Sequence, residues 1–204
     1  MIIRIGKNSM MAANLGKEIL ENCGIVIYPT ETSYGLGCKF NCKNAIKKIF
    51  QIKKRGKDKK LPVIVASKKM AYDFFELNQD ARKLVNKFMP GPLTLIVKGK
   101  KRMPKEIGET KVAFRISSNK FACELSRAIN CPVISTSANL SGRENIYAEK
   151  ELFAFDKHVD LIFTAGNLKN KKPSTIYDTT ENKIIRQGLI KKEMIEKALK
   201  KKIF

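Results

Sequence analysis

The sequence has little of what several classes of enzyme require. Among its 204 residues there is a single histidine, His158, and no tryptophan. A Ser-His-Asp triad would depend on this one imidazole. It lies in "FDKHVDLIF" just before an apolar run, where we expect an exposed connection from a helix to a strand. The sequence therefore argues against hydrolysis by such a triad.

Long apolar runs and targeting signals are also missing. No run approaches the roughly 18 apolar residues that a membrane-spanning helix needs. The N-terminus, "MIIRIGKNSMMAANLG", lacks the basic start, apolar middle and small-residue cleavage site of a secretory signal. The sequence predicts a soluble protein without a membrane partner, located in the cytoplasm.

The cysteines do not form a recognisable metal-binding pattern. There are five of them, at 23, 38, 42, 123 and 131, and no C-x-x-C pair. Cys38 and Cys42 could in principle ligate a metal, but no second pair accompanies them and His158 lies far away in sequence. We therefore expect five free thiols in a reducing compartment and no metal ligands from the protein.

Acidic residues are scarce. Lys and Arg number 41 against 19 Asp and Glu, which gives a formal net charge of +22. Such a charge attracts polyanions, including nucleotides and tRNA. Most of the excess is lysine spread along the chain, and a general lysine bias would explain it equally well. The charge is compatible with tRNA as a partner but does not establish it.

What is present is an intermixed series of helices and strands with no repeat or linker. Buried-type strands are expected at 25–29, 61–67, 93–98, 112–116, 132–136, 159–166, 174–178 and 183–188. Helices are expected at 9–24, 42–55, 119–130 and 149–156, with two more before Met89 and a Lys-rich one over 191–204. Asn41 is the expected cap of the second helix, and 30–37 is expected to be a loop. The pattern predicts the α/β class, as one domain over 1–204 with a twisted mixed sheet.

Short polar side chains follow several of these strands. Residues 135–142 read "STSANLSG" after an apolar run, Thr30 and Thr32 follow 25–29, and Ser174 begins another strand. These are ordinary turn residues, but strand ends of an open α/β sheet are also where ligands usually bind. Gly35 and Gly37 permit close approach of a ligand or of another chain segment.

Cations accompany these polar strand ends. Arg115 lies within an apolar strand, and Lys53 and Arg55 end a helix. A buried Arg115 needs an anionic partner, either a carboxylate of the protein or a ligand. Hydroxyls, amides and cations together suit nucleotide phosphates. The sequence contains neither G-x-x-x-x-G-K-[ST] nor G-x-G-x-x-G, so it does not support a P-loop or a Rossmann site.

Six segments, read in order, resemble one known family. They are "YPTETSYGLG", "IKKRGKDKKLPVIVAS", "PGPLTLIV", "VAFRIS", "PVISTSANLSG" and "STIYD" with "IIRQG". Together they resemble the YrdC/Sua5 family of threonylcarbamoyl-AMP synthases over residues 10 to 190. The resemblance implies a fold with a large cationic cavity. It also implies formation of threonylcarbamoyl-AMP and pyrophosphate from L-threonine, bicarbonate and ATP, with Mg²⁺ accompanying ATP.

The resemblance also implies partners and site residues. A downstream transferase would pass the threonylcarbamoyl group to adenosine 37 of tRNAs that read ANN codons. The implied catalytic residues are Lys53, Arg55, Ser137 and Asn139; those for threonine are Thr32, Arg115, Ser135 and Ser174; those for ATP are Arg55, Lys59, Lys111, Ser137, Asn145 and Arg186. Members commonly have Pro where this chain has Gly56, and often Thr where it has Lys111. The chain is expected to be the short form, without the extra C-terminal domain of longer Sua5 members.

Two other functions are compatible with these residues. The charge could serve an RNA-binding module with the same fold. Alternatively, the chain could form an adenylate from carbamoyl phosphate, as the YrdC-like part of hydrogenase maturation proteins does. The sequence lacks the acylphosphatase and zinc-finger segments of those proteins, which argues against the second alternative.

Overall fold

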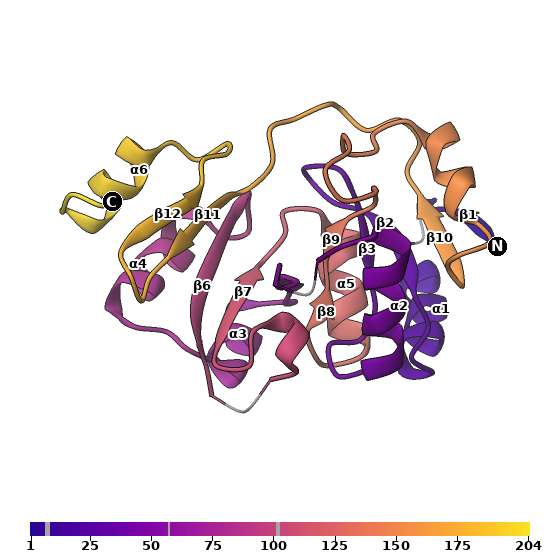
Figure 1. Ribbon diagram of the computed structural model, residues 1–204, viewed down its shortest axis with the longest axis horizontal. Coiled ribbons are helices and arrows are strands. Elements are labelled where there is room, and N and C mark those ends of the chain that lie inside the picture. The colour runs from indigo at the N-terminus through magenta and orange to yellow at the C-terminus, as the bar shows by residue number, and fades with distance from the viewer. Residues whose placement is uncertain (7–8, 57, 101–102) are drawn as a thin grey trace.

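The computed structural model, which describes residues 1–6, 9–56, 58–100 and 103–204, has two mixed β-sheets flanked by helices (Figure 1). The first sheet is five-stranded and lies toward the N-terminal end of the molecule. Its strands, in spatial order, are β1 (Ile2–Arg4), β10 (Leu161–Thr164), β2 (Val26–Pro29), β3 (Tyr34–Gly37) and β9 (Thr136–Ser137).

The second sheet is seven-stranded and lies toward the C-terminus. Its strands, in order, are β12 (Lys183–Arg186), β11 (Thr175–Asp178), β6 (Leu93–Gly99), β7 (Lys111–Arg115), β4 (Val63–Ile64) and β8 (Val133–Ile134), with β5 (Phe75–Glu76) paired to β6. The α/β prediction is confirmed. The predicted mixed pairing of strands is present, and the chain divides its strands between two sheets.

The two sheets meet where the sequence suggested one strand over 132–136. β8 pairs antiparallel with β4 of the second sheet, and β9 pairs antiparallel with β3 of the first. Between them, the amide of Ser135 donates to the carbonyl of Pro62 over 2.9 Å. The chain thus passes from one sheet to the other at Ser135, which places the polar residues after it at the junction.

Gly37, in β3, makes this junction possible. A Cβ atom there would lie 1.8 Å from the carbonyl oxygen of Ile134, so no side chain fits between the two backbones. The sequence predicted that Gly37 permits close approach of a ligand or of another chain segment, and the structure shows the segment at Ile134 in that place. The expected loop over 30–37 is correct only in its first half, because β3 occupies the second half.

We expect Gly37→Ala to lower the free energy of unfolding by about 2–3 kcal/mol, because the sheets must separate locally to admit the methyl group. Urea unfolding followed by circular dichroism measures this effect. Gly6→Ala is the matched control, because a Cβ at Gly6 meets nothing within 4 Å. Equal stability of the two variants would contradict the proposed clash.

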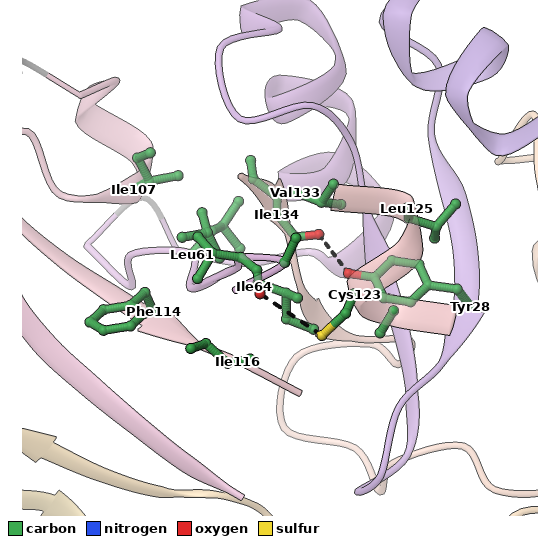
Figure 2. Packing of buried hydrophobic residues seen from close by; sticks show 14 of the residues in the cluster. Tyr28, Leu61, Ile64, Ile107, Phe114, Ile116, Cys123, Leu125, Val133 and Ile134 are labelled. Carbon is green, nitrogen blue, oxygen red and sulfur yellow. Dashed lines mark hydrogen bonds between the residues drawn. The ribbon is translucent and has the colours of Figure 1, made fainter. Parts of the chain in front are cut away.

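Buried aromatic and aliphatic side chains fill the space around the junction (Figure 2). Tyr28 of β2 is fully buried and donates its hydroxyl to the carbonyl oxygen of Ile134 over 3.0 Å. Phe114 of β7 stacks on Phe75, with 4.7 Å between ring centroids. A hydrogen bond and continuous apolar packing therefore link the two sheets.

The helices bury apolar stripes against the sheets. They are α1 (Ser9–Glu21), α2 (Lys43–Lys53), α3 (Lys68–Phe74), α4 (Gln79–Phe88), α5 (Lys120–Ala128) and α6 (Lys192–Leu199), with 3₁₀ turns η1 (Lys105–Ile107) and η2 (Glu149–Phe155). None of the described helices is long and apolar enough to cross a membrane.

Details of the helix ends differ from the predictions. Asn41 does not cap α2, whose N-cap is Cys42 without a side-chain hydrogen bond. α2 ends at Lys53, and Lys54 adopts the left-handed conformation that turns the chain toward Arg55. These corrections matter because α2 delivers the cations of the candidate site.

The prediction of five free thiols is wrong. Cys23, just after α1, and Cys42, just before α2, form a disulfide, whereas the other cysteines are buried thiols. The sequence could not reveal this pairing, because the two residues are 19 positions apart and meet only in the folded chain, with 5.4 Å between their Cα atoms. Burial raises the pKa of the Cys38 thiol to about 12, which keeps it protonated and unreactive.

Reduction of the disulfide is expected to lower the free energy of unfolding by about 3 kcal/mol, because a loop of this length no longer constrains the unfolded chain. Melting curves with and without dithiothreitol measure the difference. Cys23→Ser should melt like the reduced protein and should not respond to the reductant. A melting temperature that is the same in all these samples would exclude a stabilising role.

Candidate active site

A cavity of about 340 Å³ with both polar and apolar lining residues opens where the two sheets meet. Its walls come from β3 and β9 of the first sheet and from the middle strands of the second. Of the residues that the sequence assigned to a site, the cavity is lined by Thr32, Arg55, Arg115, Ser135, Ser137, Asn145, Ser174 and Arg186. Segments spread over more than 150 positions therefore contribute to one hollow.

Three guanidinium groups, of Arg55, Arg115 and Arg186, line this cavity. Burial lowers the pKa of Arg186, and the charges of Arg115 and Arg55 lower it further. Burial is also the main cause that lowers the pKa of Arg55. Mutual repulsion among partly buried cations is relieved when an anion binds between them. The arrangement is therefore suited to an anionic ligand.

Arg115 has a partner within the protein. Its Nη1 lies 3.1 Å from Oε1 of Glu31, and both side chains are about nine-tenths buried. The same Nη1 donates to the hydroxyl of Thr32 over 3.4 Å. The need for an anionic partner is thus met by a carboxylate of the chain, while the arginine still lines the cavity.

The hydroxyls of Thr30 and Thr32, in the turn after β2, are held in place by hydrogen bonds within that turn. Thr30 Oγ1 lies 3.1 Å from Thr32 Oγ1 and donates to the carbonyl of Ser33 over 2.7 Å. It also accepts from the amide of Thr32. The turn after β2 is therefore rigid, and it holds the Thr32 hydroxyl beside Arg115.

On the opposite wall, Arg186 of β12 is bound to Ser174. Its Nε and Nη2 donate to the carbonyl of Ser174 over 3.1 and 2.9 Å, and Nη2 also reaches Ser174 Oγ. Thr94 of β6 lies 2.9 Å from the same hydroxyl. Ser174 is therefore oriented by both of its neighbours.

Lys53 lies behind the loop after β9 and does not line the cavity. Its side chain is 1% exposed, and its ammonium donates to the carbonyls of Ser137 and Asn139 and to Asn139 Oδ1, over 2.5, 2.8 and 2.8 Å. Ser137 Oγ donates to the same Oδ1 over 2.6 Å. Lys53 therefore sets the shape of the wall that presents Ser137.

Asn139 also lies away from the cavity wall. It lines a larger hollow of about 1040 Å³ together with Asn145, which also lines the cavity. The amide nitrogen of Asn139 donates to the carbonyl of Arg143. Two of the residues implied as catalytic, Lys53 and Asn139, thus shape the loop and do not reach into the cavity.

Lys59 and Lys111 are not among the residues that line the cavity. The side chain of Lys59 is exposed, while its carbonyl accepts from Arg55 Nε over 2.9 Å. Lys111 forms ion pairs with Glu181 and, over 3.6 Å, with Asp178. The structure therefore does not bring these two lysines to the other predicted residues.

Several functional candidates were not identified from the sequence. Glu31 pairs with Arg115, and Thr94 and Lys60 line the cavity, but no sequence motif singled these three residues out. Within the described residues, no group of three His, Cys, Asp or Glu side chains could hold a metal ion. The solitary His158 is exposed, as expected, and lines the larger hollow.

Comparison with known families gives this cavity a context. The model of the Sua5/YciO/YrdC family, described as "Telomere recombination", matches residues 18–188. The chain belongs to this family. The match includes every residue that the sequence assigned to the site, from Thr32 to Arg186.

Two curated relatives within the Sua5/YciO/YrdC family have different names. A Methanocaldococcus jannaschii protein named "Putative threonylcarbamoyl-AMP synthase" is 37% identical over 182 residues, which cover 86% of this chain and 84% of that protein. Escherichia coli YciO, named as uncharacterized, is 33% identical over 185 residues, which cover 86% of this chain and 88% of YciO.

Solved structures of the Sua5/YciO/YrdC family share the fold. Sua5 from P. abyssi in complex with L-threonine has a TM-score of 0.91 and 29% identity, and the match covers 98% of this chain and 61% of the Sua5 chain. E. coli YciO has a TM-score of 0.84 and 28% identity, covering 96% of this chain and 98% of YciO. This chain thus spans less than two thirds of the Sua5 chain and nearly the whole of YciO.

Proposed function

We propose that the chain is a threonylcarbamoyl-AMP synthase, a nucleotidyltransferase that makes threonylcarbamoyl-AMP and pyrophosphate from L-threonine, bicarbonate and ATP. The observation that carries the proposal is the convergence of Arg55, Arg115 and Arg186 on one cavity with the serines of two distant loops. The name of the M. jannaschii relative and the threonine complex of P. abyssi Sua5 support it.

The amino acid is assigned to the wall that contains Arg115. A guanidinium matches a carboxylate in a two-pronged arrangement, and Nη2 and Nε of Arg115 make no hydrogen bond to another described residue. Thr32 lies beside this arginine, and Ser135 and Ser174 line the same cavity with hydroxyls that suit the polar groups of threonine.

The nucleotide is assigned to the wall that contains Arg55 and Arg186. Ser137 and Asn145 line the cavity beside them. Ile176 and Ile185 add apolar surface suited to a base. The proposal gives Lys59 a place only if its exposed side chain turns inward, and it gives Lys111 none, because two carboxylates already hold that ammonium.

The reaction needs little covalent help from the protein. Threonine's amine combines with bicarbonate, with loss of water, or with carbon dioxide, with loss of a proton, to form a carbamate. A carbamate oxygen then attacks the α-phosphorus while pyrophosphate leaves. Negative charge grows on the phosphate oxygens, where fixed guanidinium groups stabilise it. Mg²⁺ enters the proposal as part of the MgATP substrate, because the residues lining the cavity include no carboxylate that would hold it.

Downstream of this step, the mixed anhydride must be consumed by an enzyme that transfers the threonylcarbamoyl group. We assign that role to a threonylcarbamoyl transferase acting on adenosine 37 of ANN-decoding tRNAs. The net charge of +22 supports tRNA as a further partner of the chain itself.

Pyrophosphate release by the purified protein tests the proposal. With ATP and bicarbonate present, we expect release to depend on L-threonine, and serine to be a poorer substrate because it lacks the methyl group. A rate that is the same with and without threonine would contradict the proposal and favour an RNA-binding role. Carbamoyl phosphate in place of threonine tests the second alternative, an adenylate formed from carbamoyl phosphate. Two solved structures of proteins named HypF, at 16% and 14% identity, share only the fold with this chain.

A further inference from the structure

Glu31 lies directly behind the arginine assigned to the amino acid. Its Oε1 is 3.1 Å from Arg115 Nη1, and that oxygen is buried without a hydrogen bond of its own. Glu31 is absent from the lining of the cavity, whereas Arg115 is part of it. The carboxylate therefore acts on a ligand only through the arginine.

The position of Glu31 is fixed from the other side. Ser117 Oγ donates to Oε2 of Glu31 and accepts from the backbone amide of Asn119 over 3.1 Å. Asn119 is the N-cap of α5, and its side chain accepts from the amide of Ala122. The carboxylate is thus tied to the start of helix α5 by contacts outside the cavity.

The three cavity arginines differ in this respect. Arg115 is ion-paired with a carboxylate. The side-chain hydrogen bonds of Arg55 reach the carbonyls of Lys59 and Lys60, and those of Arg186 reach Ser174. Neither of these two forms an ion pair with a described carboxylate. The charge of Asp58 acts on Arg55 without a direct ion pair. Positive charge is therefore neutralised most directly at Arg115.

This asymmetry matters because the proposed substrates compete for the same cations. A triphosphate carries several negative charges and a threonine carboxylate only one, so unpaired arginines at similar distances favour the triphosphate. A carboxylate behind Arg115 weakens its attraction for phosphate while leaving its free edge able to form directional hydrogen bonds.

We propose that Glu31 is a specificity-determining positioning residue, which reserves Arg115 for the amino-acid carboxylate by neutralising it against phosphate groups. The role in threonine selection rests on the proposed function. The effect on anion binding does not, because it concerns only the charges in the cavity.

The test compares Glu31→Gln with the unchanged protein. Calorimetric titration with pyrophosphate alone is expected to show about tenfold tighter binding to Glu31→Gln, because Arg115 becomes available to phosphate. In the synthase assay, the KM for threonine should rise about tenfold while that for ATP stays equal or falls. Loss of a merely structural residue would not tighten the binding of any anion.

Asp80→Asn is the matched control. It also removes one negative charge from a carboxylate that pairs with a cation, Lys201, but Asp80 does not line the cavity. We expect its pyrophosphate affinity to be that of the unchanged protein. Ser117→Ala keeps the charge of Glu31 but removes the hydroxyl that anchors it. Like Glu31→Gln, it should tighten pyrophosphate binding and raise the KM for threonine, but by smaller factors.

The inference would be overturned if Glu31→Gln bound pyrophosphate no more tightly than the unchanged protein. It would also be overturned if Asp80→Asn tightened pyrophosphate binding by the same factor as Glu31→Gln. Should Glu31→Gln fail to fold, as judged by its melting curve, Ser117→Ala decides by the same titration. Absence of threonine-dependent turnover in the unchanged protein would refute the proposed function, whereas the titrations would still decide whether Glu31 controls anion binding.

Discussion

Replacing Arg115 by alanine is expected to raise the KM for L-threonine by about a hundredfold or more, while the KM for ATP changes by less than about threefold. The guanidinium faces the cavity beside Thr32 and is proposed to hold the amino-acid carboxylate. Initial rates of pyrophosphate release, measured while each substrate is varied in turn, separate the two constants.

Two further variants sharpen this experiment. Arg115→Lys keeps the charge but loses the two-pronged geometry, so it should fall between alanine and the unchanged protein. Arg82→Ala removes a cation that stacks on Tyr72 and does not line the cavity, and it should leave both constants unchanged. An equal rise in both constants for Arg115→Ala would contradict its assignment to the amino acid.

The second large effect is expected for Lys53→Met. The ammonium of Lys53 donates hydrogen bonds to three oxygens of the loop that presents Ser137. Methionine has similar length but no donor, so it leaves these buried acceptors unsatisfied and lowers the free energy of unfolding by about 2–4 kcal/mol. Displacement of the loop should also lower kcat by about a hundredfold at temperatures where the variant is folded.

Urea unfolding and the pyrophosphate assay at low temperature measure these two effects. Lys47→Met is the control, because Lys47 is an exposed lysine on the same helix α2. Full activity of folded Lys53→Met would show that the loop keeps its shape without the ammonium and would refute the positioning role.

The pH dependence of stability gives an independent measure of Lys53. Burial, aided by the charge of Arg55, lowers the pKa of the ammonium from 10.5 to about 7. Between these values the unfolded chain binds more protons than the folded one, so this group makes stability rise with pH across that interval and stops doing so above it. The difference in unfolding free energy between the unchanged protein and Lys53→Met should therefore increase from pH 7 to pH 9.

Much of the local structure could be predicted from sequence periodicity. Residues 43–53 form a helix with the expected apolar face of Ala45, Ile46, Ile49 and Phe50, and strands β2, β6 and β7 lie where apolar runs stood. These elements depend on neighbours a few positions away, which a sequence displays directly. The polar residues at strand ends and Arg115 could also be identified as candidate site residues, because each stands next to an apolar run in the sequence.

Other features depended on contacts between distant segments. The switch between sheets at Ser135 is dictated by pairing with β4 and β3, and the disulfide by the fold that brings Cys23 and Cys42 together. Likewise, the sequence could not show that Glu31 would lie against Arg115, or that Lys53 would turn away from the cavity to hold a loop.

The sequence by itself determined the α/β class, most helices and strands, and the chemical types of the residues that gather at the cavity. The tertiary structure alone decided that there are two sheets, which polar side chains face the cavity, and which cations carry a carboxylate partner. The physical reason is that hydrophobic periodicity is a local property of the chain, whereas charge pairing and the burial of an ammonium depend on which distant segments pack together.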